Sequence, residues 1–224
     1  MTLWAILPVK PLREGKSRLA RVLEPDERAR INRWLLQRTL RIVGQTPGVD
    51  QVLVVSRDTA VLALARSWGA RVLQESGESN LNSTLTRTAA LLHSWRVPYM
   101  LILAVDLPGL APEDVEALVR PLRAEPMPAR GRLVIAPDEA RQGTNALGLA
   151  PPAGYRFSYG PGSFLRHVRL AHRQGRDVQV VHREGLAQDL DWPRDLRLLQ
   201  RAFPDLAQKA LSPQIRPHPS PWPG

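Results

Sequence analysis

Residues Tyr99–Asp106 read YMLILAVD, an unbroken apolar run that ends in a carboxylate. A continuous apolar segment of this length is typical of a strand buried on both faces, as in a parallel sheet covered by helices. A carboxylate at the tip of such a strand is costly unless it is paired or binds a metal. We therefore expect residues 99–105 to form a central strand and Asp106 to lie at a ligand site.

On both sides of this run, short apolar segments alternate with longer segments of helical periodicity. Strands are expected at 3–9, 51–56, 70–74, 99–105, 133–136, 146–149 and 178–182, and helices at 27–43, 58–68, 81–95, 112–122, 163–174 and after Pro193. This order predicts a single α/β domain with three layers, α/β/α, around a mostly parallel sheet. We expect residues 1–203 to form the domain and the Pro-rich residues 204–224 to form a disordered tail.

The composition limits the class of protein. The 224 residues include no cysteine, which excludes a disulfide scaffold, a cysteine zinc site and thiol catalysis. No apolar segment reaches the roughly 18 residues of a membrane span, and the N-terminus lacks the basic region of a signal peptide. We therefore expect a cytoplasmic protein that does not bind a membrane.

The charge is strongly basic, with a net value of +10. Such a charge suits the phosphates of a nucleic acid or of a phosphorylated small molecule, while much of it can simply be a solvated surface. The sequence contains no basic motif interleaved with aromatic residues, and its basic residues cluster after the first expected strand instead of along one helix. Nucleic-acid binding is therefore the weaker alternative, and we expect no nucleic-acid partner.

The basic cluster is Lys10–Arg18, KPLREGKSR. Its spacing is neither that of a P-loop nor that of a dinucleotide-binding glycine motif. It nevertheless follows a strand, at the edge of the sheet where ligands bind. We expect Lys10, Lys16 and Arg18 to bind the phosphates of a nucleotide, with a solvated loop as the alternative.

Two further carboxylates follow at Asp189 and Asp191 in the sequence QDLDWPRD. In an extended segment, side chains at positions i and i+2 point the same way, and two adjacent carboxylates repel each other unless a cation lies between them. With Asp106 they form a candidate Mg²⁺ site. The alternatives are that Asp106 serves a turn or helix cap, and that Asp191 and Asp195 serve the N-terminus of the next helix.

Two glycine-containing loops remain, Gly143-Thr144-Asn145 and Gly160-Pro-Gly-Ser163. The second allows backbone N–H groups to approach a ligand, and Ser163 opens a helix whose N-terminus suits an anion. The five histidines show no metal-binding spacing and are expected to be structural.

The ordered motifs together resemble the 2-phospho-L-lactate/phosphoenolpyruvate guanylyltransferases of coenzyme F-420 biosynthesis, which are MobA-like nucleotidyltransferases with a glycosyltransferase-A-like fold. The resemblance covers residues 3–200. Its blocks are Pro8-Val-Lys10 with Lys16-Ser-Arg-Leu19; Leu81-Asn82; Asp106-Leu-Pro108; Gly143-Thr-Asn-Ala-Leu147 with Gly160-Pro-Gly-Ser-Phe164; and Asp189-Leu-Asp191 with Pro193 and Asp195-Leu196.

The resemblance implies a guanylyltransferase that moves GMP from GTP to a phosphorylated three-carbon acid. It implies that Mg²⁺ is held by Asp106, Asp189 and Asp191, that Lys16 and Arg18 hold the GTP phosphates, and that Lys16, Arg18 and Asp106 carry catalysis. Asn82 would lie near the nucleoside, and the acceptor would be contacted by Thr144, Gly160 and Ser163.

The sequence departs from the family pattern at Gln142, where a glycine is usual, and at Trp192, where Thr or Ser is common. Phosphoenolpyruvate is the expected acceptor, with 2-phospho-L-lactate and 3-phosphoglycerate left open. A cytidylyl- or molybdopterin-type transferase of the same superfamily is a further alternative. The oligomeric state is also open, with a homodimer as one option.

Overall fold

The computed structural model describes residues 2–75, 80–196 and 204. The expected tail at 204–224 lies outside these residues except for Pro204. The helix expected after Pro193 is described as far as Leu196, and residues 193–196 are helical.

Seven strands form one sheet in the order β3-β2-β1-β4-β6-β5-β7. Strand β1 pairs in parallel with β2 and β4, whereas β6 runs antiparallel to both of its neighbours, β4 and β5. The strands are β1 Leu3–Pro8, β2 Gln51–Ser56, β3 Arg71–Gln74, β4 Tyr99–Leu103, β5 Arg132–Pro137, β6 Thr144–Ala150 and β7 Asp177–Val180. The prediction of a mostly parallel sheet is confirmed.

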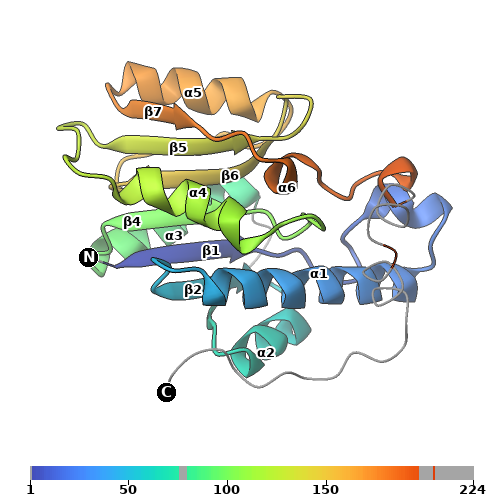
Figure 1. Cartoon of the computed structure of the whole chain (residues 1–224). Helices are drawn as coiled ribbons and strands as arrows, with labels where there is room; N and C mark the ends of the chain where they lie inside the picture. Colours follow the sequence, from blue (N-terminus) through green and yellow to red (C-terminus); the bar gives the residue numbers. More distant parts are fainter. Residues whose placement is uncertain (1, 76–79, 197–203, 205–224) are drawn as a thin grey trace.

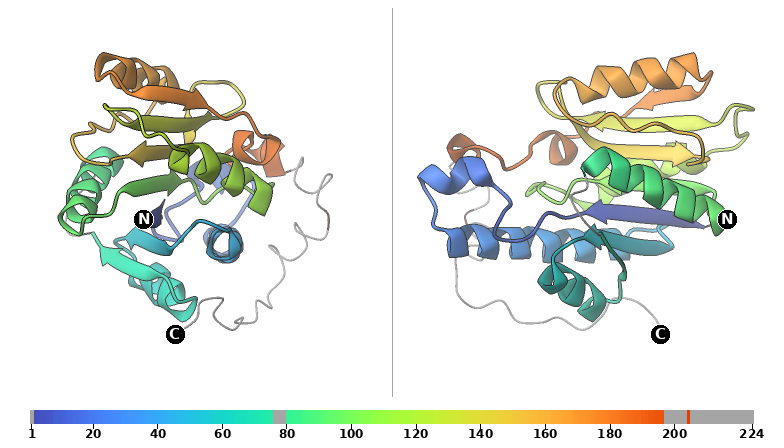
Figure 2. Two further views of the ribbon diagram at one scale, coloured as in Figure 1. Left: turned by 60° about the vertical axis from the view of Figure 1, so that its left-hand side comes forward. Right: turned by 180° about the vertical axis from the view of Figure 1, so that it is seen from behind.

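Helices cover both faces of this sheet (Figures 1 and 2). Side chains of α1, α2 and α4 join the apolar cluster on one face, and those of α3 and α5 join the cluster on the other. The helices are α1 Pro25–Gln45, α2 Thr59–Ser67, α3 Leu81–Ser94, α4 Pro112–Arg123, α5 Ser163–Arg173, α6 Glu184–Ala187 and the short 3-10 helix η1 Ser17–Arg21. The three-layer arrangement is the one that the sequence predicts.

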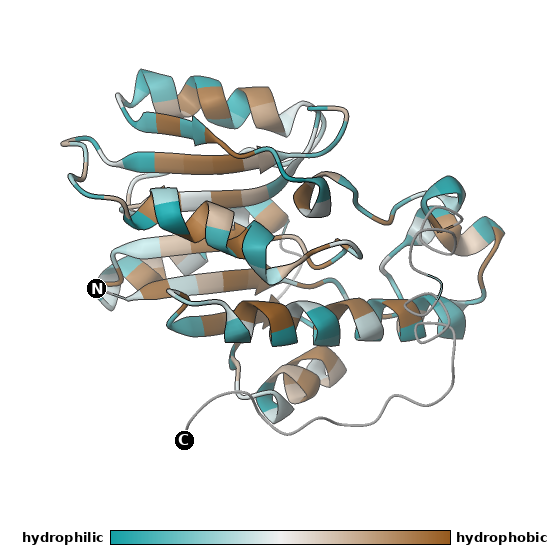
Figure 3. Cartoon of the chain, viewed as in Figure 1, coloured by the Kyte–Doolittle hydropathy of each residue, from teal (hydrophilic) through white to brown (hydrophobic). Residues whose placement is uncertain are grey.

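Strands β1 to β6 each contribute to both apolar clusters because successive side chains of a strand point to opposite faces, whereas edge strand β7 contributes Val178 to one of them. In β1, Leu3, Ala5 and Leu7 enter one cluster, while Trp4 and Ile6 enter the other. All of β4 is buried. Figure 3 shows the hydrophobic colour gathered on the strands and alternating with the hydrophilic colour along α1. The unbroken apolar runs therefore reflect burial on both faces.

Some boundaries differ from those expected. Strand β6 is longer than predicted because it is hydrogen-bonded on both edges, and its first residues, Thr144 and Asn145, are buried. Helices η1 and α6 were not predicted, since elements of four or five residues are too short to show a helical period. Among the described residues, no helix is both long and apolar enough to cross a membrane.

The turn before β5 depends on Gly131. Its φ is +82°, and an added Cβ would occupy the space of the Ala150 carbonyl oxygen on neighbouring β6. Gly154 has a similar φ of +72° but has no atom within 4 Å of an added Cβ. Comparing a substitution at Gly131 with one at Gly154 therefore separates the cost of steric overlap from the cost of backbone strain.

We predict that Gly131→Ala lowers the free energy of unfolding by about 2 kcal/mol more than Gly154→Ala does, because only the first adds a clash to the strain of a positive φ. Urea denaturation of the two variants and the unchanged protein measures the difference. Equal losses in the two variants would contradict the packing at the β5–β6 edge.

Candidate active site

A cavity of about 570 Å³ opens at the edge of the sheet where β1 and β4 end. Open α/β sheets bind ligands at this edge, so the position agrees with the expectation from the sequence. The expected site residues that line it are Lys10, Lys16, Asp106, Thr144 and Asp191. The other five contact residues that line the cavity or lie close to them. Arg18 forms an ion pair with Asp191, and an oxygen of Asp189 lies close to one of Asp191. Asn82 bonds to the Tyr159 backbone, and Ser163 contacts both Thr144 and Gly160.

Three carboxylates meet at this edge. Oxygens of Asp106, Asp189 and Asp191 all lie within 4.8 Å of one another. Asp106 follows β4, whereas the other two follow α6, and the Leu190 backbone N–H donates to the Asp106 carbonyl at 2.9 Å. This backbone contact brings the two segments together. The cluster expected from sequence spacing therefore exists in the fold.

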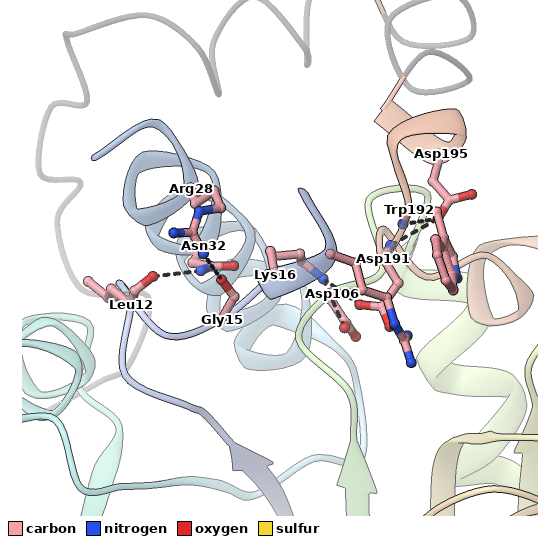
Figure 4. A network of polar contacts seen from close by, with 10 residues as sticks. Leu12, Gly15, Lys16, Arg28, Asn32, Asp106, Asp191, Trp192 and Asp195 are labelled. Atoms are coloured by element: carbon pink, nitrogen blue, oxygen red, sulfur yellow. Dashed lines mark hydrogen bonds and ion pairs between the residues drawn. The ribbon is translucent and has the colours of Figure 1, made fainter. Parts of the chain in front are cut away.

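Asp195 has a different role. Its Oδ2 accepts the backbone N–H groups of Asp191 and Trp192 at 3.0 and 2.6 Å (Figure 4). Asp195 thus holds the turn that presents Asp191. The alternative that these aspartates serve the N-terminus of the next helix is therefore right for Asp195. The Asp191 carboxylate takes no part in these two hydrogen bonds.

Lys16 contacts two carboxylates of the cluster. Its Nζ lies 2.9 Å from Asp106 Oδ2 and 3.6 Å from Asp191 Oδ1, and its side chain is only 4% exposed. The Arg18 Nη1 lies 2.8 Å from Asp191 Oδ2, and its guanidinium stacks over the Trp192 ring at 4.7 Å. The basic loop therefore forms one charged network with two of the carboxylates, Asp106 and Asp191 (Figure 4).

The basic loop is fixed from beneath by α1 and the start of α2. Asn32 Nδ2 donates to the Leu12 carbonyl at 2.7 Å, and the Leu12 N–H donates to Asp58 Oδ2 at 2.9 Å. An added Cβ on Gly15 would meet Asn32 Nδ2 at 2.6 Å, so the loop packs closely on α1. These contacts hold the backbone on either side of Lys16 against the cavity.

The surroundings of Asp189 disfavour its ionised form. Burial, and after it repulsion from Asp106 and Asp191, raises the pKa of Asp189 from its usual 3.8 to about 6. A raised carboxyl pKa marks a site where a further positive charge would be stabilising. Three oxygen donors that close together fit a hard divalent cation such as Mg²⁺.

Short helix α6 places Asp189 and Asp191. Arg183 Nε donates to the buried Asp114 Oδ1 at 2.8 Å, and Asn145 Nδ2 donates to the Leu186 carbonyl at 2.9 Å. An added Cβ on Gly185 would overlap the Asp114 carboxylate and lie 2.8 Å from the Gly109 carbonyl oxygen. Sequence reasoning did not find these positioning residues, because their partners are far away in the chain.

A buried polar group lies on the other side of the cavity. Thr144 Oγ1 lies 3.0 Å from Ser163 Oγ and 3.3 Å from His167 Nδ1. The Ser163 N–H donates to the Gly160 carbonyl at 3.0 Å, within a turn in which Gly160 and Gly162 have φ of +120° and +71°. The structure therefore brings together Thr144, Gly160 and Ser163, and their predicted contact with an acceptor stays a prediction.

Asn82 is engaged by the backbone of Tyr159. Its Nδ2 donates to the Tyr159 carbonyl at 3.2 Å, and its Oδ1 accepts the Tyr159 N–H at 2.6 Å. Tyr159 itself lines the cavity. Asn82 thus fixes a wall of the cavity from α3, and the predicted contact with a nucleoside stays a prediction.

A guanylyltransferase family model, described as "Guanylyl transferase CofC like", matches residues 3–200. The phosphoenolpyruvate guanylyltransferase of Rubrobacter xylanophilus is 42% identical over 200 residues, which cover 89% of this chain and 94% of that protein. The phosphoenolpyruvate guanylyltransferase of Sphaerobacter thermophilus is 38% identical over 200 residues, covering 89% and 93%.

Solved structures of low sequence identity share the fold. A Desulfovibrio desulfuricans G20 protein assigned to the nucleotide-diphospho-sugar transferases superposes with a TM-score of 0.72 at 16% identity, covering 90% of this chain and 88% of that one. The 4-diphosphocytidyl-2C-methyl-D-erythritol synthase of Anaerococcus prevotii gives 0.61 at 11% identity, covering 91% and 96%.

The carboxylate cluster leads to a pH-dependent prediction for the metal-free protein. Because the pKa of Asp189 is higher in the folded chain than in the unfolded chain, its ionised form costs stability above about pH 6, and this cost vanishes below about pH 4. Asp189→Asn should therefore raise the free energy of unfolding at pH 8 by about 1–2 kcal/mol, allowing for solvent screening of this half-buried group.

Urea denaturation with a chelator at pH 8 and pH 4 measures this effect, and the gain should be nearly absent at pH 4. Glu116→Gln, an equal change of charge on an exposed side chain of α4, serves as the control. A loss of stability at pH 8 in Asp189→Asn would show that the cluster is already neutralised.

Proposed function

We propose that this chain, which belongs to the CofC-like guanylyl transferase family, transfers GMP from GTP to phosphoenolpyruvate and releases diphosphate. The family predicted from the ordered sequence motifs is thereby confirmed. The observation that carries the choice of acceptor is the similarity, across about nine-tenths of the chain, to several relatives named phosphoenolpyruvate guanylyltransferase.

We assign the triphosphate to the basic side of the cavity. Lys10 and Lys16 line it, and Arg18 lies at its rim beside Asp191. An ammonium can act as a point charge on any phosphate oxygen, whereas a guanidinium can grip two oxygens at once. These residues would align GTP and stabilise the charge that develops on the departing diphosphate.

Asp106, Asp189 and Asp191 would hold Mg²⁺. The fit rests on their mutual distances and on the environment of Asp189, where burial and then repulsion from Asp106 and Asp191 raise its pKa to about 6. When bound, the ion supplies Lewis-acid polarisation of phosphoryl oxygens and a template for the triphosphate. The Lys16 ammonium contacts both Asp106 and Asp191 and so offsets part of the repulsion between these two carboxylates.

We assign the acceptor to the polar group formed by Thr144, Gly160 and Ser163 on the opposite side. A phosphate oxygen of the acceptor forms a bond to the α-phosphorus of GTP, and the bond from that phosphorus to the bridging oxygen of the β-phosphate breaks. Because a phosphate monoester is largely a dianion at pH 7, no side chain needs to remove a proton from it. The protein's task is alignment and charge stabilisation. We place this reaction in coenzyme F-420 biosynthesis, in the cytoplasm.

We predict that Asp106→Asn and Asp191→Asn each lower turnover by at least about a hundredfold while leaving the fold intact, because each removes a negatively charged ligand of the proposed Mg²⁺ site. Diphosphate release measures turnover, and circular dichroism measures folding. Glu116→Gln is the matched control, since its side chain is exposed and does not line the cavity. Near-normal turnover in both aspartate variants would exclude the metal assignment.

A substrate screen tests the proposed function itself. We expect diphosphate release with GTP and phosphoenolpyruvate in the presence of Mg²⁺, and much less with CTP or ATP. The same assay with 2-phospho-L-lactate and 3-phosphoglycerate ranks the acceptors. A preference for CTP, or turnover with 3-phosphoglycerate alone, would favour another member of the superfamily.

A further inference from the structure

His167 lies behind the acceptor side of the cavity and has no role in the chemistry described above. It belongs to α5, four residues after Ser163, and its side chain is completely buried. The ring packs edge-on against Tyr159, which lines the cavity, with 4.9 Å between centroids. A fully buried histidine beside a ligand site is constrained in both protonation and orientation.

The hydrogen bonds of the ring determine where its proton lies. The Ser158 backbone N–H donates to His167 Nε2 at 2.9 Å. A backbone N–H can only donate, so Nε2 must carry no proton. In a neutral imidazole the single proton is then on Nδ1. Burial, with a smaller effect from Arg166, lowers the pKa of His167 to about 4, which is consistent with a neutral ring.

This tautomer fixes the role of the Thr144 hydroxyl. His167 Nδ1–H points to Thr144 Oγ1 at 3.3 Å, so the hydroxyl oxygen is the acceptor in that contact. The Thr144 O–H proton is then left to be donated elsewhere. The two available directions are Ser163 Oγ at 3.0 Å and a ligand in the cavity, which Thr144 lines.

We propose that His167 is a positioning residue that holds the Thr144 hydroxyl as a hydrogen-bond donor toward the anionic acceptor substrate. The order of donation is Ser158 N–H to His167, His167 to Thr144, and Thr144 to the carboxylate or phosphate of the acceptor. With the opposite tautomer, Thr144 would donate to the ring, and its lone pairs would face an anion. The inference rests on the proposed function only for the identity of the acceptor.

The first test needs no substrate. Long-range ¹H–¹⁵N correlation spectra of the full chain at neutral pH distinguish the two tautomers, and the His167→Asn variant identifies the signals of this ring among the five histidines. We expect a neutral ring protonated on Nδ1. A ring protonated on Nε2, or an imidazolium, would overturn the inference whatever the substrate.

The second test is a double-mutant cycle with phosphoenolpyruvate and GTP. His167→Leu should raise the KM for phosphoenolpyruvate roughly tenfold and leave the KM for GTP unchanged, since it removes the support of one hydrogen bond to a charged group. His167→Asn, whose amide nitrogen takes the place of Nδ1, should recover most of the loss. In a Thr144→Val background, His167→Leu should have no further effect on either KM.

The exposed His172 of the same helix provides the control, and His172→Leu should leave both KM values unchanged. If His167→Leu raises the KM by the same factor with and without the Thr144 hydroxyl, its role is merely structural and the inference fails. If the unchanged protein does not use phosphoenolpyruvate at all, the proposed function fails instead, and the spectra still decide the tautomer.

Discussion

Mutual repulsion among Asp106, Asp189 and Asp191 is the constraint on which the site depends. Their oxygens lie within 4.8 Å of one another, and for Asp189 burial together with repulsion from the other two makes the ionised form costly. The fold opposes this repulsion in three ways. Strand β4 presents Asp106 at the edge of the sheet, the buried Lys16 ammonium contacts Asp106 and Asp191, and the contacts of Arg183 and Gly185 with Asp114 of α4 hold the segment that leads to Asp189 and Asp191.

The antiparallel strand β6 explains how both sides of the cavity come to one edge of the sheet. Parallel strands bring their carboxyl ends to this edge, and Asp106 follows that rule. Because β6 runs the other way, its first residues, Thr144 and Asn145, lie where β4 ends, and Ala104 N–H donates to the Asn145 carbonyl at 2.8 Å. The Thr144 side chain of β6 thus contacts Ser163 and His167, while the neighbouring Asn145 supports the segment that carries Asp189.

The layered fold could be predicted because its cause is local. Unbroken apolar runs such as residues 99–105 reveal strands buried on both faces, and the spacing between them reveals helices. The strand-end rule likewise located Asp106 and the basic loop. Pairings between distant residues could not be predicted, such as Lys16 with Asp106 across 90 positions or His167 with Thr144 across 23. Only the observation that His167 lies one helical turn after Ser163 could have suggested its place.

The chain order of the carboxylates separates the formation of the sheet from the completion of the site. Asp106 precedes β5, β6 and β7, whereas Asp189 and Asp191 come after all seven strands. A chain emerging from a ribosome can therefore build its sheet while Lys16 faces Asp106 alone, and the like charges converge only when the segment after α6 docks. The electrostatically unfavourable step comes last, on a scaffold that is already assembled.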